Sequence, residues 1–397
     1  MRTAAVAVIA LAVLIVLLPA TAQQPAPPAS GAPGQPGAAA PQARPHLAPS
    51  HDHPAEAVFE NIKVLNGIPS DEVVPSMRFF AGALGVGCDH CHFPDKGHEG
   101  FANDDKKPKQ IARQMITMVK QINDNNFKGE QEVTCATCHN GKPNPSRTAP
   151  VATPELLKAR ANMQPLPDRS TFPQATQLFQ SFTDAIGGQA AVDKLKSIRA
   201  TGQIDLGRGG PVTFEAMQEA PNKSYTKVDF APNRVHTEAF DGTTAWAKDG
   251  PRVNELQGAE LAATRLDANF YLEFDPKKVF PNAQTRGKDK IGDTDVWVVR
   301  ASQGRDQPQE LFYFDAANHQ LLRRVLLVPT PFGPLNTQLD YADWHEVNGV
   351  KIAFTITQTR PGGITTQKLT KVELNVPVDE KMFAKPASDG AAAPGTR

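Results

Sequence analysis

Cysteine is scarce in this chain, with only four among 397 residues. All four lie in two short Cys-x-x-Cys sequences, so none is left for a structural disulfide, a lipid-modified N-terminus or a separate catalytic thiol. The disulfide framework that stabilises many small secreted domains is therefore excluded. Whatever the cysteines do, they do it as two closely spaced pairs.

Net charge is also absent, because Lys+Arg and Asp+Glu each total 42. A balanced chain offers neither the basic surface that nucleic acid requires nor a polybasic signal for anionic lipid. We therefore expect no nucleic-acid partner. A local cluster of charge can still steer a protein partner, and Lys106, Lys107 and Lys109 are candidates for one.

Long apolar runs are missing except near the N-terminus, where residues 4–18 follow Arg2. This run is shorter than the ~20 residues of a comfortable membrane span, and Ala20-Thr21-Ala22 has the small-x-small pattern of a cleavage site. We expect residues 1–22 to be a signal peptide, with an uncleaved anchor as the alternative. Either one places the rest of the chain in the periplasm, membrane-associated in the second case.

The length favours two domains, since it exceeds what one core usually holds. Composition and periodicity then divide the chain. The expected parts are a disordered Pro/Ala/Gly-rich tether over 23–50, a mostly α-helical domain over 51–145, a linker over 146–172, an antiparallel-β domain over 173–388 and a disordered tail over 389–397.

Helical periodicity is concentrated in the first half of the chain. It predicts helices over about 57–65, 75–84, 107–125, 155–162 and 173–195. In the third of these, Ile111, Met115, Met118 and Ile122 are spaced three or four apart and form one apolar stripe.

From residue 197 to 376 the apolar period changes to two, which is typical of half-buried strands. Turn sequences separate these runs, at Asp241-Gly242, Asp249-Gly250, Asn348-Gly349 and Pro361-Gly362-Gly363. Short turns between successive strands predict an antiparallel sheet. One helical insertion is expected at about 255–271.

Each cysteine pair is followed directly by histidine, which is the attachment sequence of c-type haem. Cysteines three apart lie on one side of a helical turn, so both sulfurs can reach the vinyl groups on one porphyrin edge. The next residue then places an imidazole under the iron. The sequence thus predicts two covalently bound haem c groups, attached by Cys88, Cys91, Cys135 and Cys138, with His92 and His139 as iron ligands.

Three other sites use paired Cys-x-x-Cys sequences. Zinc ribbons usually bring their pairs closer than the 44 positions from Cys91 to Cys135, and they need no histidine after each pair. A thioredoxin-like dithiol requires a strand-then-helix context. Two vicinal disulfides would close tiny loops and stabilise little. Two complete haem motifs that use every cysteine favour haem.

The second axial ligands stay open when they are judged from spacing alone. Met77 precedes the first motif on a predicted helix and can cover the far face of that haem, although a helical Met is more often a core residue. Near the second motif, Met115 and Met118 share one helix face. His90 and His98 are rival ligands beside the first haem.

Residues 59–141 resemble the cytochrome c subunit of photosynthetic reaction centres. The resemblance is carried by Asn61 to Pro69, Leu84-Gly85-Val86-Gly87-Cys88, the helix from Arg113 to Asn123, and Val133 to His139. It implies that Met77 binds the first iron and Met115 the second, which leaves Met118 as a core residue beside the haem. That family has four haem motifs and this chain has two, so we expect a related electron carrier with a different partner.

The second domain is loosely similar to the LolA/LolB-type lipoprotein-carrier fold. The similarity rests on Ala185-Ile186-Gly187-Gly188 to Leu195, on the Asp241-Gly242 turn, and on Asp340-Tyr341-Ala342-Asp343-Trp344 to Gly349-Val350-Lys351. It implies an α+β domain with a curved antiparallel sheet, a half-barrel, and helices. Such a concavity can hold an apolar ligand, or it can be a packed core that only positions the first domain.

The expected function is outer-sphere electron transfer to a redox protein or a membrane electron-transfer complex, and not catalysis. Two alternatives stay open. One is a peroxidase-like enzyme with a five-coordinate iron, and the other is an apolar-ligand carrier whose haems sense redox state. His236, His319 and His345 form no nucleophile–base arrangement in the sequence pattern.

Overall fold

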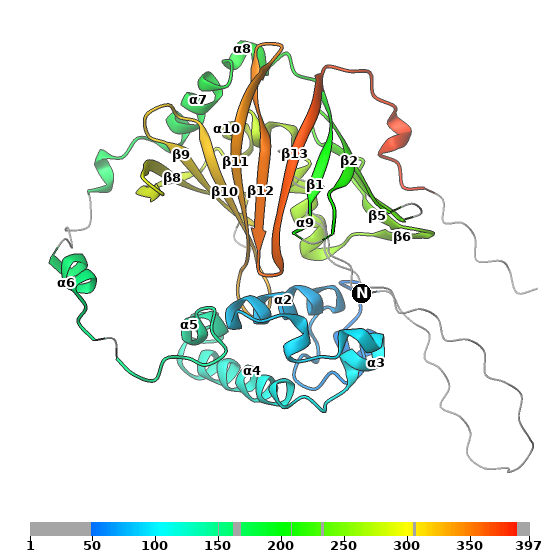
Figure 1. Cartoon of the computed structure of the whole chain (residues 1–397), viewed down its shortest axis with the longest axis vertical. Helices are drawn as coiled ribbons and strands as arrows, with labels where there is room; N and C mark the ends of the chain where they lie inside the picture. Colours follow the sequence, from blue (N-terminus) through cyan, green and yellow to red (C-terminus); the bar gives the residue numbers. More distant parts are fainter. Residues whose placement is uncertain are drawn as a thin grey trace, which may run out of the picture.

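The computed structural model describes residues 49–149, 151–161, 168–207, 209–231, 234–304 and 307–386. The predicted signal peptide, nearly all of the predicted tether and the predicted tail lie outside these residues. Figure 1 shows a helical region, residues 49–149, lying against one end of a sheet region, residues 168–386.

Helices of the first half of the chain are short, apart from two. They are α1 (Ala55–Val58), η1 (Ser70–Glu72), α2 (Val73–Leu84), η2 (Cys88–His90), η3 (Pro94–Lys96), α3 (Gly97–Ala102), α4 (Lys107–Asn126), α5 (Cys135–His139) and α6 (Pro154–Ala161). The predicted helices that precede the two motifs are confirmed as α2 and α4. The predicted helix in the linker is confirmed as α6.

The helix predicted over about 57–65 is wrong beyond Val58. The backbone is extended at Phe59 and has a positive φ of 59° at Asn61. Two backbone hydrogen bonds explain the change, from the Ala55 N–H to the Ile68 carbonyl and from the Ser70 N–H to the His53 carbonyl, both 2.8 Å. They tie the two ends of this segment together, so the residues between form a loop instead of a helix.

The sheet region adds η4 (Arg169–Thr171), α7 (Ala175–Ala185), α8 (Gln189–Val192), α9 (Gly258–Asp267), η5 (Phe270–Glu273), α10 (Pro276–Val279) and η6 (Glu380–Met382). The single helix predicted over 173–195 is divided into α7 and α8. Gly187 and Gly188 have φ values of 138° and 84°, which end α7 because such angles do not continue a right-handed helix. The expected insertion at 255–271 is α9 with η5.

Thirteen strands form one antiparallel sheet in the described residues. They are β1 (Ser197–Asp205), β2 (Val212–Glu219), β3 (Lys223–Ala231), β4 (Arg234–Phe240), β5 (Ala245–Asp249), β6 (Arg252–Glu255), β7 (Gln284–Ile291), β8 (Thr294–Ser302), β9 (Gln309–Asp315), β10 (Leu321–Val328), β11 (Leu335–Val347), β12 (Val350–Arg360) and β13 (Gly363–Leu374). All four predicted turn sequences connect neighbouring strands.

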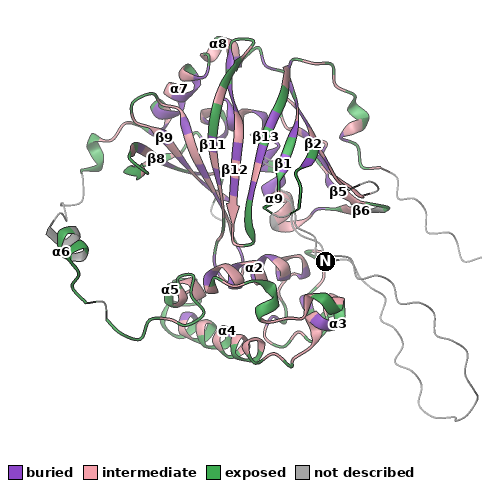
Figure 2. Cartoon of the chain, viewed as in Figure 1, coloured by how far each residue is buried: buried purple, intermediate pink, exposed green. Residues whose placement is uncertain are grey.

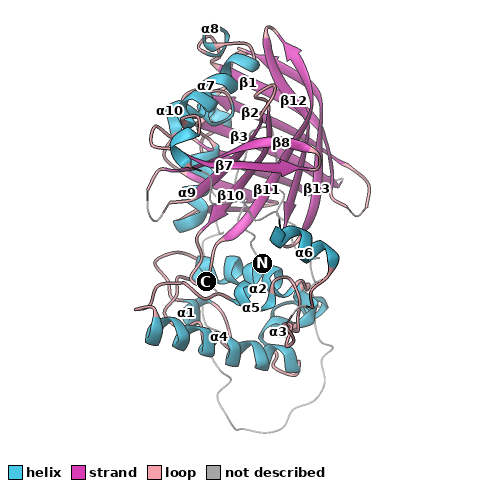
Figure 3. Ribbon diagram, turned by 90° about the vertical axis from the view of Figure 1, so that its left-hand side faces the viewer, coloured by secondary structure: helices cyan, strands magenta, loops and turns pink. Residues whose placement is uncertain are grey.

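Strand order is β6-β5-β4-β3-β2-β1-β13-β12-β11-β10-β9-β8-β7. Every neighbour is also a neighbour in sequence except the central pair β1 and β13, which aligns Ile198 with Leu374. The sheet is therefore a meander whose first and last strands meet in its middle. It curves over one layer of helices that includes α7, α9 and α10 (Figure 3).

The main core lies between these helices and the concave face of the sheet. Phe179 and Phe182 of α7 meet Phe312 and Phe314 of β9, with ring centroids 5.3 Å apart for Phe179 and Phe312. Phe280 packs on the same group. All five rings are buried, and stacking of this kind adds to the hydrophobic effect of their burial.

One charged cluster lies inside this core. Arg324 is 0% exposed, and its guanidinium donates to Glu273 and to Glu310, the latter at 2.7 Å. The carboxyl of Asp267 is 3.5 Å away. Burial raises the pKa of Asp267 and of Glu310 well above their usual range. A single guanidinium therefore lies among three carboxyls, and burial favours the protonated form of two of them, Asp267 and Glu310.

Two hairpin tips of the sheet reach the helical region (Figure 1). Phe332, between β10 and β11, packs against Phe80 of α2 with centroids 5.0 Å apart. The side chain of Gln131 donates to the Thr330 carbonyl at 3.1 Å. At the other tip, a Cβ on Gly82 would lie 2.6 Å from the Pro361 side chain, so the β12–β13 turn touches α2 directly.

Candidate haem sites

The first motif forms a single helical turn. The N–H groups of Cys91 and His92 both donate to the Cys88 carbonyl, at 3.3 and 3.0 Å. Cys88 is exposed and Cys91 is partly buried, and burial raises the pKa of the Cys91 thiol. One turn of helix is the geometry that presents two sulfurs, three residues apart, along one side of the segment.

The second motif is the short helix α5. Thr134 precedes it, and its N–H donates to the hydroxyl of Thr137 at 3.0 Å, which supports the start of the helix. Cys135 is partly buried and Cys138 is exposed. Each motif thus has one sheltered and one exposed cysteine.

Both candidate iron-binding histidines are held in the same way. Nδ1 of His92 lies 3.0 Å from the Phe101 carbonyl, and Nδ1 of His139 lies 2.9 Å from the Lys142 carbonyl. A carbonyl only accepts, so Nδ1 carries the proton and Nε2 keeps its lone pair for a metal. Burial, with Lys109 nearby, also lowers the pKa of His92, which favours the neutral, ligating form.

The structure brings the two motifs close to one helix. The Gly141 N–H, just after the second motif, donates to the Ala83 carbonyl of α2 at 2.8 Å. A Cβ on Gly85 would collide with the Gly141 carbonyl, so only glycine fits there. The second motif therefore docks against the end of α2, four residues before Cys88.

The candidate methionines occupy different surroundings. Met77 lies on α2, partly buried, against a small apolar cluster of Leu65, Phe79, Phe80 and Ile116. Met115 is partly buried on α4, whereas Met118 is 41% exposed and so is not part of a protein core. The rival ligands His90 and His98 are both exposed.

A charged cluster around Asp104 fastens the loop after the first motif to α4. The Asp104 carboxyl pairs with Arg113 at 2.8 Å, Lys63 at 2.7 Å and Lys109 at 3.2 Å. Hydrogen bonds from Arg113, set against some burial, hold the pKa of this carboxyl far below its usual range. The same loop supplies the Phe101 carbonyl to His92, so the cluster positions that histidine.

The structure changes the interpretation of the lysine cluster. The Lys109 side chain is 11% exposed, and its Nζ donates to the carbonyls of Phe101, Ala102 and Asn103 at 2.7 to 3.0 Å. Lys106 donates to the Asp89 carbonyl. Two of the three lysines therefore donate to backbone carbonyls, Lys106 within the first motif and Lys109 after it, and they do not form a free docking surface.

Haem fits the chemistry that these residues offer. The helical region buries few side chains, while apolar groups on α4 stay open, with Ile111 44% and Met118 41% exposed (Figure 2). A site with a fixed Nε2 directly after two thiols suits a covalently attached haem. Zinc suits it less, because no cluster of three or more Cys, His, Asp or Glu side chains arranged to hold a metal is found among the described residues.

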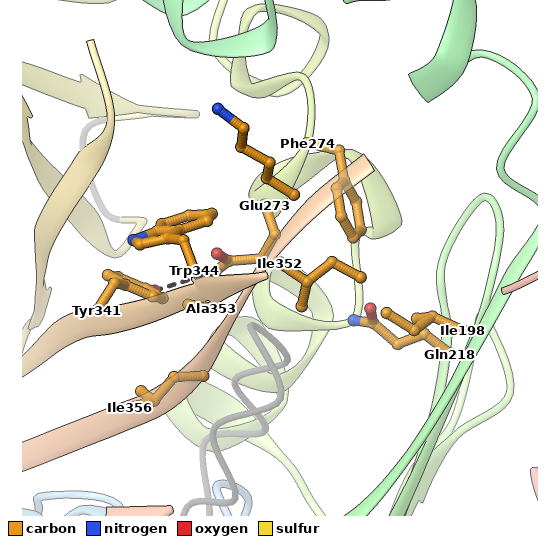
Figure 4. A pocket seen from close by; sticks show the side chains of 10 residues that line it. Ile198, Gln218, Glu273, Phe274, Tyr341, Trp344, Ile352, Ala353 and Ile356 are labelled. Atoms are coloured by element: carbon orange, nitrogen blue, oxygen red, sulfur yellow. Dashed lines mark hydrogen bonds between the residues drawn. The ribbon is translucent and has the colours of Figure 1, made fainter. Parts of the chain in front are cut away.

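Helices and aromatic rings pack against the concave side of the sheet. A cavity of about 30 Å³ remains between η5 and the strands, lined by residues that include Gln218, Glu273, Tyr341, Trp344 and Ile356 (Figure 4). That space suits one or two water molecules, whereas drug-sized ligands need about 300 Å³ or more. The structure therefore favours the packed-core interpretation here over an apolar ligand.

Within the part of the chain that the structure describes, no helix is both long enough and apolar enough to cross a bilayer.

Comparison with known families confirms the predicted resemblance of the first domain. Residues 27–186 match the family model of the photosynthetic reaction centre cytochrome C subunit. A reaction centre cytochrome c subunit from Roseobacter denitrificans is 31% identical over 219 residues, covering 51% of this chain and 58% of that protein. Cytochrome c-554 from Chloroflexus aurantiacus is 38% identical over 91 residues, or 21% of each chain. This chain thus spans roughly a fifth to just over half the length of these two relatives.

Two solved structures resemble about half of this chain at low sequence identity. A LolA superfamily protein from Nitrosomonas europaea and a lipoprotein-sorting protein domain from Vibrio parahaemolyticus each give a TM-score of 0.40 at 13% identity. The first covers 54% of this chain and 99% of its own, and the second 53% and 96%.

Proposed function

We propose that this chain is a dihaem c-type cytochrome that transfers electrons outside the cytoplasm. The observation that carries the proposal is that the two motif histidines have the same hydrogen-bonding arrangement. Each has Nδ1 on a backbone carbonyl, which leaves Nε2 for iron, directly after two cysteines on one helical turn. The relationship to reaction centre cytochrome c subunits supports the same chemistry.

Each proposed site has a full set of protein ligands. Cys88 and Cys91 would attach the first haem, with His92 and Met77 on its two faces. The second set is Cys135, Cys138, His139 and Met115. When bound, each iron supplies a one-electron couple. With both axial positions taken by protein, no site is left for a substrate, which favours an electron carrier over a peroxidase-like enzyme.

In this proposal, the carbonyls of Phe101 and Lys142 position the two histidine rings. By accepting from Nδ1 they fix the ring orientation and raise the basicity of Nε2, as partners beyond the first ligands do in metal sites. Lys109 holds the Phe101 carbonyl in place, and Asp104 holds Lys109. The first histidine is therefore the more firmly fixed of the two.

Location and partner follow from the same proposal. Haem attachment through Cys-x-x-Cys-His belongs with export, so the N-terminal residues 1–22 would direct the chain to the periplasm. The relatives are named as reaction centre subunits, and we propose a membrane electron-transfer complex or a redox protein as partner. The chain shows two haem motifs, and nothing in them requires a photosynthetic partner.

The test is production of the full chain with a cytochrome c maturation system. Two added haem masses and wholly low-spin spectra, unaffected by carbon monoxide, are expected. One haem or none would overturn the dihaem proposal, and a high-spin component that reacts with peroxide would favour the peroxidase-like alternative.

The axial ligands have a separate test. Met77→Ala should remove one Met–iron charge-transfer band and lower the potential of that haem, while Met118→Ala, on the same helix as Met115, should leave both haems unchanged. A charge-transfer band lost in Met118→Ala would show that the choice between Met115 and Met118 is wrong.

A further inference from the structure

The sheet region and the first haem motif meet on the helix α2. This helix carries Met77, the proposed ligand of the first haem, and it ends at Leu84, four residues before Cys88. Other contacts of α2 come from the sheet region. The β12–β13 turn touches Gly82, and the β10–β11 tip touches Phe79 and Phe80. A charge that the sheet places here is therefore next to the first haem.

The tip between β10 and β11 fixes how closely the two regions approach. A Cβ on Gly333 would lie 2.6 Å from the Phe79 ring and 3.1 Å from Thr134. Phe332 belongs to the same apolar cluster as Met77 and Cys135. Because this contact is packed and apolar, side-chain shape helps to define the position of α2 under the sheet.

Two arginines face this junction, one from each region. Arg78 follows Met77 on α2, one turn before Gly82, and Arg360 ends β12 beside Pro361. Burial, with the neighbouring charge of Arg78, lowers the pKa of Arg360 to about 10. With that pKa, Arg360 stays charged at neutral pH.

The first motif and one carboxyl lie near this pair. Burial lowers the pKa of Arg78, while Glu260 of α9 and the Cys88 sulfur act in the opposite direction. The start of α9 abuts the helical region, since a Cβ on Gly258 would lie 2.5 Å from the Asp71 carboxyl. The junction therefore holds two arginines close to the start of the first haem motif, with the Glu260 carboxyl beside Arg78.

We propose that Arg360, supplied by the sheet region, acts with Arg78 to raise the reduction potential of the first haem above that of the second. The inference rests on the proposed dihaem function. Positive charge favours the ferrous over the ferric iron because the ferric form carries one more positive charge. Partly buried charges are screened less by salt than exposed ones, so their effect reaches the iron. The sheet region is then a tuning element of the cytochrome.

The experiment is a redox titration of the full chain carrying both haems, followed by visible spectroscopy. The couple that Met77→Ala displaces identifies the first haem. Arg360→Gln should then lower the ferrous-to-ferric ratio of this haem about tenfold at a fixed applied potential, a shift of about 59 mV for one electron. The second couple should stay in place, and Arg360→Lys, which keeps the charge, should restore the first.

Two further variants separate charge from damage. Glu260→Gln removes the negative charge beside Arg78, so it should raise the potential of the first haem, opposite in sign to Arg360→Gln. Lys371→Gln removes an exposed positive charge on the same strand pair, roughly 26 Å along β13 at ~3.3 Å per residue. It should change neither couple.

The outcomes divide clearly. If both haems attach but Arg360→Gln moves neither couple, or if Arg360→Gln and Glu260→Gln move the first couple in the same direction, the tuning proposal is overturned while the dihaem function stands. If the chain carries no haem, the proposed function itself fails.

Discussion

The helical region and the sheet region achieve stability in different ways. The sheet region encloses rings such as Phe179, Phe182 and Phe314 between helices and a curved sheet. The helical region buries a small group centred on Phe79, Phe80 and Ile116, and Phe332 and Leu335 from the sheet region pack against it. A region with so little core of its own depends on an added group and on its neighbour, as small domains generally do.

The largest expected effect comes from withholding haem. In the full chain made without haem attachment, we expect the helical region to open at a free-energy cost near zero, because its own core is small. The sheet region should keep its protection. Hydrogen exchange followed by mass spectrometry would measure both regions in one sample, with the haem-loaded chain as control. Equal protection of α4 with and without haem would contradict the comparison.

The next effect lies inside the sheet region. Arg324→Met leaves Glu273, Glu310 and Asp267 without their shared guanidinium, so the free energy of unfolding should fall by about 3–5 kcal/mol. Chemical denaturation followed by tryptophan fluorescence would measure it. Arg199→Met is the matched control, because its side chain is 44% exposed and its pair with Glu215 contributes at most about 1 kcal/mol.

The contact between the regions has an intermediate effect. Phe332→Ala should weaken the docking of α2 by about 2 kcal/mol, less than a fully buried ring would, because Phe332 is only partly buried. Limited proteolysis should then cut the helical region faster while the sheet region resists as before. Phe332→Leu keeps apolar volume and serves as control. An unchanged cleavage rate in Phe332→Ala would mean that the regions do not support each other.

A pH dependence should belong to the sheet region. Asp267 has a raised pKa in the folded chain, so it binds a proton there that the unfolded chain releases near pH 4. The stabilisation that this bound proton provides is complete below pH 4. It is lost as the pH rises toward the pKa of Asp267 in the folded chain, at about 1.4 kcal/mol per pH unit. Asp267→Asn cannot titrate, so its stability relative to the parent chain should increase over that rise. Denaturation midpoints of both chains at several pH values would measure this. A stability difference that does not change with pH would contradict the prediction.

The smallest expected effect is in the loop after the first motif. Asp104→Asn weakens its pairs with Lys63, Lys109 and Arg113, which are partly exposed, so the expected cost is about 0.5 kcal/mol and should shrink in high salt. Thermal denaturation at two salt concentrations would measure it. The low pKa of Asp104 means that this contribution is lost as the pH falls through the acid range.

The local sequence was enough to predict those elements whose conformation depends on neighbouring residues. The helices before the motifs, the strand turns at Asp241-Gly242 and Asn348-Gly349, and the helical turn of Cys135–His139 all follow from periodicity and from residues that fit one backbone conformation. The division of the helix over 173–195 was also encoded locally, since Gly187 and Gly188 permit the required angles. That signal is weak, because glycine permits such angles without imposing them.

The periodicity of apolar residues could not predict contacts between residues that are distant in the chain. The helix expected over 57–65 gave way to a loop because Ala55 pairs with Ile68 and Ser70 with His53. The charge pattern favours an outward-facing Lys109 side chain, whereas in the structure this side chain donates to the carbonyls of Phe101, Ala102 and Asn103 at the end of α3. A charge run in a sequence does not say whether a side chain turns outward or back to the chain.

The sequence by itself determined which residues carry the chemistry, namely four cysteines and two following histidines in a spacing that one helical turn satisfies. It also determined the half with period two, which forms the antiparallel sheet. Tertiary structure decided where that chemistry sits. It packed helices against the concave face of the sheet, and it laid the tips at Phe332 and Arg360 against α2. The physical reason is that such packing and charge proximity arise from residues hundreds of positions apart, whose meeting no local pattern records.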